Sequence, residues 1–257
     1  MEDSVRFVRN GEVALALERR GGGGRHVLFA HGWISSRRMW YEVAERLDRE
    51  RFTLHLLDFR GCGRSDRPRG AHALEDYASD LRAAISLIEA PVTLVGHSMG
   101  ARIAQFVAAE RPPGLERLVL VAPGAARPLR VPAARRSMVA SAYGSRAAIE
   151  RFIRASMARD VEPAVMERVV DDALQCQEEH WFDLHDRARA DFSARLAAID
   201  VPVLAIAGER DPLAPPSRVK RDVAALIPGS LFVVVRECGH NLPIESPAEI
   251  AAAVARW

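Results

Sequence analysis

The sequence predicts an α/β fold, with a mostly parallel β-sheet, flanking helices and a helical insertion. Three observations predict it. Short apolar runs alternate with longer stretches of helical periodicity, the runs are near-continuous in Val, Ile and Leu, and one long stretch contains no such run. Near-continuous runs are typical of strands buried on both faces of a parallel sheet. Their alternation with helices indicates right-handed crossover connections.

Seven apolar runs are the candidate strands. They cover residues 13–17, 26–30, 52–57, 92–95, 118–121, 201–207 and 231–235. Four glycines at 21–24 follow the first run and predict a flexible turn. The helical patterns outside the insertion cover residues 74–88, 99–109 and 247–257. The last of them begins with Ser246 at the N-cap and Pro247 at the first helical position.

The regular alternation stops at residues 124–198, where no strand is predicted and helical patterns cover 147–157, 163–176 and 181–196. Helices inserted between two strands of a parallel sheet predict a cap over the carboxyl ends of the strands, where open α/β sheets bind ligands. We therefore expect a core of residues 1–123 and 199–257 and a cap of residues 124–198.

The composition argues against a nucleic-acid-binding protein and against a membrane-spanning one. The chain has 36 Lys and Arg against 34 Asp and Glu, without the basic excess of a nucleic-acid binder, and it has no apolar run of about 18 residues that would span a membrane. Its three cysteines, Cys62, Cys176 and Cys238, form no CxxC pair, which favours free thiols in a reducing compartment. The N-terminus shows no secretory signal pattern. We expect a cytoplasmic protein without nucleic-acid or membrane partners.

The segment Gly96-His97-Ser98-Met99-Gly100 has the pattern G-x-S-x-G. It follows a predicted strand and opens a predicted helix, which is the context of a nucleophile elbow. Small flanking residues suit this tight turn, because the serine backbone is strained and its neighbours approach closely. The pattern predicts Ser98 as a nucleophile. It also puts the Met99 backbone N–H at a helix N-terminus, where a developing oxyanion is stabilised.

A serine nucleophile needs a base, and the base needs a carboxylate that fixes its tautomer. His240 follows the last predicted strand and is the candidate base. Asp211 follows the strand before it and is the candidate acid, with Glu209 as the alternative. The chain order Ser98, Asp211, His240 is the order of α/β enzymes with this elbow.

Further candidates surround this predicted triad. The backbone N–H of Trp33, at the end of an early strand, is the candidate second oxyanion donor. The rings of Trp33, Phe152, Trp181 and Phe182 are candidates for the substrate pocket, with packing of the cap onto the core as the alternative. His180 and His185 lie in the predicted cap, where we expect structural or surface roles. No metal-ligand spacing, phosphate loop or GxGxxG motif is present, so we expect no cofactor.

With these motifs, the chain resembles the α/β-hydrolase superfamily along nearly its whole length. The resemblance rests on five segments in order: residues 31–33, 58–65, 96–100, 208–211 and 239–240. It implies the α/β-hydrolase fold and a serine enzyme. In relatives, the segment 58–65 is a structural loop.

The predicted reaction is hydrolysis of a small, mostly apolar carboxylic ester or lactone through an acyl-enzyme. A thioesterase, a carbon–carbon bond hydrolase and a cofactor-free haloperoxidase-like enzyme are alternatives on the same triad. Carbon–carbon bond hydrolases usually carry Asn before the serine and Gly-Gly after it, whereas this chain has His97 and Gly100-Ala101. A small-molecule binding module is the alternative from a different class, but binding does not need a nucleophile.

Overall fold

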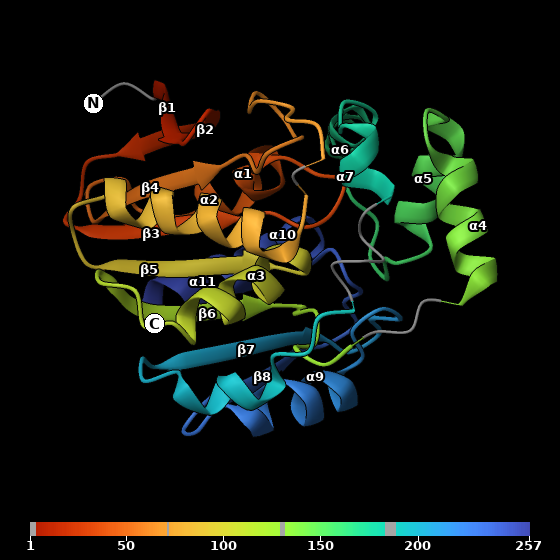
Figure 1. The fold of residues 1–257 in the computed structure, drawn as a ribbon. Helices are drawn as coiled ribbons and strands as arrows, with labels where there is room; N and C mark the ends of the chain where they lie inside the picture. Colours follow the sequence, from red (N-terminus) through yellow and green to blue (C-terminus); the bar gives the residue numbers. More distant parts are fainter. Residues whose placement is uncertain (1–3, 71, 129–131, 183–188) are drawn as a thin grey trace.

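The computed structural model describes residues 4–70, 72–128, 132–182 and 189–257. These residues form an eight-stranded sheet in the order β1-β2-β4-β3-β5-β6-β7-β8 (Figure 1). The strands are β1 Ser4–Asn10, β2 Val13–Gly21, β3 Arg25–Ala30, β4 Phe52–Leu57, β5 Val92–His97, β6 Leu115–Val121, β7 Val203–Gly208 and β8 Leu231–Val235.

The sheet is parallel from β4 to β8, and β2 pairs antiparallel with both β1 and β4. This confirms the predicted mostly parallel α/β fold, and all seven predicted strands are present. Strand β1 is not among the predicted strands. Only Val8 of β1 is buried, and Arg6 and Arg9 interrupt its apolar residues. An exposed edge strand of this kind leaves no near-continuous apolar run to detect.

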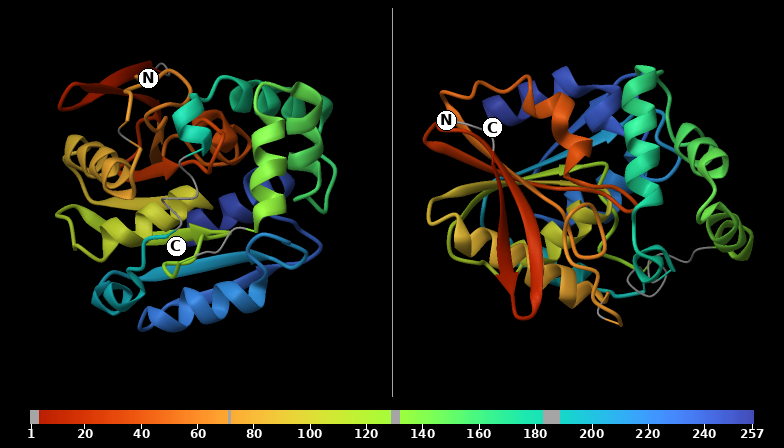
Figure 2. Two further views of the ribbon diagram at one scale, coloured as in Figure 1. Left: turned by 45° about the vertical axis from the view of Figure 1, so that its right-hand side comes forward. Right: turned by 90° about the horizontal axis from the view of Figure 1, so that it is seen from above.

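Helices cover both faces of the sheet (Figure 2). The α-helices are α1 Tyr41–Ala44, α2 Leu74–Leu87, α3 Met99–Ala108, α4 Ala133–Ala142, α5 Arg146–Arg154, α6 Pro163–Leu174, α7 Glu178–Phe182, α9 Pro216–Asp222, α10 Leu242–Glu245 and α11 Pro247–Arg256. The 3-10 helices are η1 Arg37–Trp40, η2 Ser193–Ala198 and η3 Ala224–Leu226. Apolar residues of α2 and α3 form a core with one face of the sheet, and those of α1 and α11 form a core with the other.

Between β6 and β7, the described residues contain helices and no strand. Helices α4 to α7 lie beside the carboxyl ends of the strands, on the right of Figure 1. They pack on the core through buried residues that include Ile34, Met39, Val169 and Trp181. We call residues 124–198 the insertion. No described helix is long and apolar enough to cross a membrane.

The expectation of one helix over 181–196 is wrong. Helix α7 ends at Phe182, residues 183–188 lie outside the described part, and residues 190–192 are not helical before η2 begins at Ser193. The ring of Phe192 packs edge-on against Phe106 of α3, with ring centroids 5.2 Å apart. Arg102 of α3 donates to the carbonyl of Ala190 at 2.6 Å. These contacts hold Ala190 and Phe192 against α3.

Candidate active site

Ser98 occupies the sharp turn between β5 and α3. Its backbone is in a rare conformation, with φ 50° and ψ −109°, and non-glycine residues adopt such strained angles mainly at functional sites. The flanking glycines are sterically required. A Cβ at Gly96 would lie 2.6 Å from the Cα of Ala101, and one at Gly100 would lie 2.4 Å from the carbonyl oxygen of His31.

Three side chains from three strand ends form one hydrogen-bonded chain. The Nε2 of His240 lies 2.9 Å from the Oγ of Ser98, and its Nδ1 lies 2.8 Å from the Oδ2 of Asp211. Because a carboxylate only accepts, Nδ1 carries the proton, and the Nε2 lone pair is free to accept from the serine hydroxyl. Asp211 follows β7, and His240 follows β8.

Asp211 is the acid that reaches His240. It is only 2% exposed, and its Oδ1 accepts the backbone N–H groups of Leu213 at 2.7 Å and Ala214 at 2.9 Å. Burial raises the pKa of Asp211, but the hydrogen bond and charge of His240 and the two amide bonds lower it more, so the net pKa lies below its usual value. Glu209, the alternative acid, is exposed and accepts the N–H of Glu237 at 2.8 Å.

The loop that carries His240 is held by a residue that the sequence analysis missed. Glu245 is 6% exposed, and its carboxylate accepts the backbone N–H groups of Gly239 at 2.9 Å and Asn241 at 2.8 Å. The backbone N–H of His240 donates to the carbonyl of Ser156 in the insertion at 2.8 Å. No recognised motif pointed to Glu245, since its partners are backbone groups.

The two candidate oxyanion donors lie beside Ser98. Met99 is the first residue of α3, and Trp33 follows β3. Among the described residues, neither backbone N–H has a hydrogen-bond acceptor. Both residues line the same cavity as Ser98 and His240. Two unsatisfied donors at the nucleophile are what an oxyanion hole requires.

A cavity of about 200 Å³ opens at Ser98. Its lining is mostly apolar, with Arg102 and Arg218 as its charged members among the described residues. Of the four rings expected at a pocket, Trp33 and Phe152 line this cavity. They pack edge-on with ring centroids 5.8 Å apart.

Trp181 and Phe182 do not line the cavity. Trp181 is 1% exposed, packs behind Trp33 with ring centroids 5.2 Å apart, and donates from Nε1 to the carbonyl of Ala173. Phe182 packs on Tyr143. Trp181 belongs to the buried apolar cluster of the insertion, and Phe182 packs against that cluster.

His97 supports the candidate site from within the elbow. Its Nε2 lies 2.9 Å from the carbonyl oxygen of His240, so Nε2 carries the proton and donates. Burial, with the nearby charge of His240, lowers the pKa of His97 to about 3, so the ring is neutral near pH 7. His180 is buried and hydrogen-bonds with Tyr77, whereas His185 lies outside the described residues.

Comparison with known proteins identifies the family. Residues 27–253 match the model of the Alpha/beta hydrolase family. The chain belongs to this family. Its structure is also similar to that of an esterase from Exiguobacterium antarcticum, with a TM-score of 0.90 and 20% identity over 98% of each chain. At this level of identity, the likeness concerns the fold.

Sequence relatives of this α/β hydrolase differ in how much they share. An uncharacterized protein of Mycobacterium tuberculosis is 36% identical over 107 residues, which cover 41% of this chain and 31% of that protein. The match thus spans about a third of that relative. A pimeloyl-[acyl-carrier protein] methyl ester esterase of Neisseria meningitidis is 27% identical over 243 residues, which cover 90% of this chain and 92% of the esterase.

Proposed function

We propose that this α/β hydrolase is a serine esterase or lactonase acting on small carboxylic esters. Ser98 is the nucleophile, His240 the general base, and Asp211 the residue that orients the base. The observation that carries the proposal is the hydrogen-bonded chain from Ser98 through His240 to Asp211, at 2.9 Å and 2.8 Å, at the wall of a mostly apolar cavity.

The proposed reaction has two steps. His240 takes the hydroxyl proton of Ser98 while Oγ attacks the ester carbonyl carbon, and the N–H groups of Met99 and Trp33 bind the resulting oxyanion. His240 then gives the proton to the leaving alkoxide, and the C–O bond breaks to leave an acyl-enzyme. In the second step, His240 deprotonates a water molecule, which attacks the acyl carbon. The bond from that carbon to Oγ of Ser98 breaks, His240 returns its proton to Oγ, and the acid is released.

The size and lining of the cavity support a small acyl group. A volume of about 200 Å³ lies below the roughly 300–1,000 Å³ that is usual for ligand pockets. The Neisseria relative is a methyl ester esterase by name, which supports carboxylic ester cleavage here. We further propose that residues 124–198 act as a cap, because Phe152 and Val139 of this insertion line the cavity beside Ser98.

Thioesters, carbon–carbon bonds and haloperoxidase-like chemistry use the same three residues. A matched panel separates them: p-nitrophenyl esters, aliphatic lactones, acyl thioesters, a vinylogous 1,5-diketone, and halide with hydrogen peroxide and a carboxylic acid. The proposal expects the esters or lactones to have the highest kcat/KM. Preference for any other member by more than tenfold would replace it.

Labelling with a fluorophosphonate tests the nucleophile. We expect one adduct per chain, on Ser98, and no adduct in Ser98→Ala. Ser141→Ala is the matched control, because Ser141 is an exposed serine of α4, and it should label and turn over like the wild type. Ester turnover by a folded Ser98→Ala protein within tenfold of wild type would overturn the assignment. Tight ligand binding without turnover in wild type would favour a binding module.

A further inference from the structure

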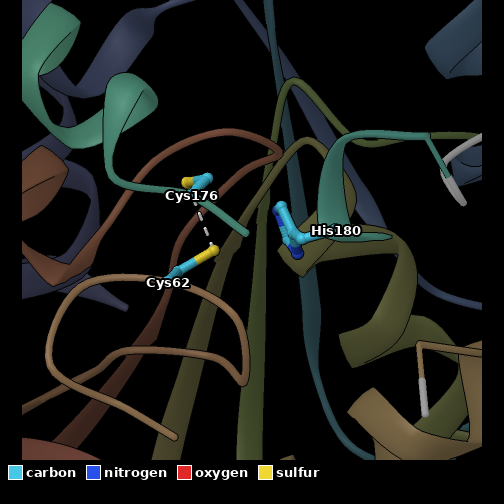
Figure 3. A group of neighbouring side chains, drawn as sticks. All are labelled: Cys62, Cys176 and His180. Atoms are coloured by element: carbon cyan, nitrogen blue, oxygen red, sulfur yellow. Dashed lines mark hydrogen bonds between the residues drawn. The ribbon is translucent and has the colours of Figure 1, made fainter. Parts of the chain in front are cut away.

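Three soft or borderline metal ligands meet away from Ser98. Cys62 lies in the loop after β4, Cys176 follows α6, and His180 lies in α7 (Figure 3). All three are buried, and one ligand atom from each lies within 4.8 Å of the others. The two sulfur atoms are 3.5 Å apart. Core and insertion thus converge on one point.

The backbone fixes this convergence. Gln177, next to Cys176, donates its N–H to the carbonyl of Gly61 at 2.8 Å. Gly61 has φ +77°, and a Cβ there would lie 3.2 Å from the Cβ of His180. A glycine before Cys62 therefore suits both the left-handed turn and the close approach to α7.

A chain of hydrogen bonds determines which nitrogen of His180 has a lone pair. The Nε2 of His72 lies 3.0 Å from the carbonyl oxygen of Pro68 and must donate to it. The Nδ1 of neutral His72 then accepts from the hydroxyl of Tyr77 at 2.7 Å. The Tyr77 oxygen in turn accepts from Nδ1 of His180 at 2.6 Å. His180 is left with its lone pair on Nε2.

An independent contact agrees with this tautomer. The backbone N–H of Ile34 donates to Nε2 of His180 at 3.4 Å, so Nε2 is the acceptor, and an ion bound at Nε2 would replace this long hydrogen bond. A histidine whose other ring nitrogen donates to a fixed oxygen is the usual arrangement of a metal ligand, because the partner sets the tautomer and the ring orientation.

We propose that Cys62, Cys176 and His180 bind a thiophilic divalent cation, with Zn²⁺ as the ion best suited. Two sulfurs on one tetrahedral zinc lie about 3.8 Å apart, from Zn–S bonds of about 2.3 Å, close to the 3.5 Å found here. Binding converts two thiols to thiolates and releases two protons to solvent. Two thiolates and a neutral imidazole make the centre electrically neutral with Zn²⁺, which suits a buried site.

The proposed ion would join the core to the insertion. Cys62 belongs to the loop at residues 58–65, whereas Cys176 and His180 belong to the insertion. The carbonyl of His180 also accepts the indole N–H of Trp33 at 3.2 Å. An ion at this point would therefore hold α7 against the segment that carries a proposed oxyanion donor. The site itself does not depend on the proposed esterase activity.

Titration of the reduced full-length protein with Zn²⁺ in weak buffer tests the proposal. We expect one ion per chain with release of two protons, and a rise in Tm. Cd²⁺ should give a thiolate-to-metal absorption band of the same stoichiometry. The double variant Cys62→Ser, Cys176→Ser should lose the proton release, the band and the rise in Tm together.

Two further variants keep the test specific. Cys238→Ser should bind like the wild type, because Cys238 is a buried cysteine outside the cluster. Tyr77→Phe removes the acceptor for Nδ1 of His180 and should weaken binding roughly ten- to a hundredfold. Zinc binding that survives in the double cysteine variant would overturn the proposal. A reduced wild-type protein that shows no Cd²⁺ band would also overturn it. The same holds if the two thiols form a disulfide on mild oxidation but the reduced protein binds no ion.

Discussion

The carboxylate of Glu245 accepts the backbone N–H of Gly239, the residue before His240, at 2.9 Å. The same oxygen accepts the N–H groups of Ala158 at 2.7 Å and Arg159 at 3.0 Å, both in the insertion. The other oxygen accepts the N–H of Asn241 at 2.8 Å. One buried carboxylate thus satisfies four backbone donors from two segments, and it ties the loop of the proposed base to the insertion.

Glu245→Gln should therefore impair catalysis, although Glu245 itself does not contact the substrate. The amide keeps one acceptor oxygen but turns an NH₂ group toward backbone donors, which leaves buried N–H groups unpaired at about 1–3 kcal/mol each. We expect lower stability and roughly a tenfold loss of kcat at nearly constant KM, measured on a short p-nitrophenyl ester. Glu249→Gln, a change of an exposed carboxylate in the next helix, α11, is the control. Equal kcat in the two variants would show that Glu245 does not position His240.

The choice of Asp211 over Glu209 has its own test. Asp211→Asn keeps the shape but presents an amide to Nδ1 of His240, so the imidazole adopts the wrong tautomer, and kcat should fall by about four orders of magnitude. Glu209→Gln should stay within a few-fold of the wild type, because Glu209 is exposed and contacts the backbone of Glu237. Steady-state kinetics of both variants decide which residue is the acid. A larger loss of kcat in Glu209→Gln than in Asp211→Asn would contradict the assignment.

The elbow and the two loops were predictable because each lies at the carboxyl end of a predicted strand. In a parallel sheet, those ends meet at one edge, so Ser98 after β5, Asp211 after β7 and His240 after β8 are brought within hydrogen-bond distance. Short motifs that require an unusual backbone conformation, such as the glycines around Ser98, can be recognised in a single sequence.

Contacts that depend on the docking of the insertion were not predictable. Trp33 and Trp181 were both candidates for the pocket, yet one lines the cavity and the other packs behind it. The role of Glu245 depends on backbone N–H groups some 87 residues away, which no side-chain pattern records. The same holds for the meeting of Cys62 and Cys176, since their spacing of 114 residues matches no metal motif.

Acid sensitivity of the fold should depend in part on His55. This residue is 2% exposed, and burial, with the charges of His26, Arg6 and Arg19, lowers its pKa from 6.5 to about 3. Below pH 6.5, His55 binds a proton in the unfolded chain but stays neutral in the folded state. The folded state therefore loses about 1.4 kcal/mol per pH unit at this site as the pH falls.

Urea unfolding at a series of pH values measures this contribution. His55→Gln lacks the titrating group, so the free energy of unfolding of the wild type relative to the variant should fall between pH 6 and pH 4 and stay level above pH 7.5. His97, whose pKa burial also lowers to about 3, is present in both proteins and cancels from the difference. Parallel curves over the whole range would contradict a buried, neutral His55.

Phe152 should set the length of acyl chain that the enzyme accepts. Its ring lines the cavity and packs edge-on against Trp33, so Phe152→Ala enlarges the space beside Ser98. We expect the preferred p-nitrophenyl ester to shift to a longer acyl chain, with kcat/KM for acetate reduced several-fold and that for octanoate raised. Phe182→Ala is the matched control, since Phe182 packs on Tyr143 and does not line the cavity. A parallel shift in both variants would mean that loosening of the insertion, rather than the shape of the cavity, governs substrate length.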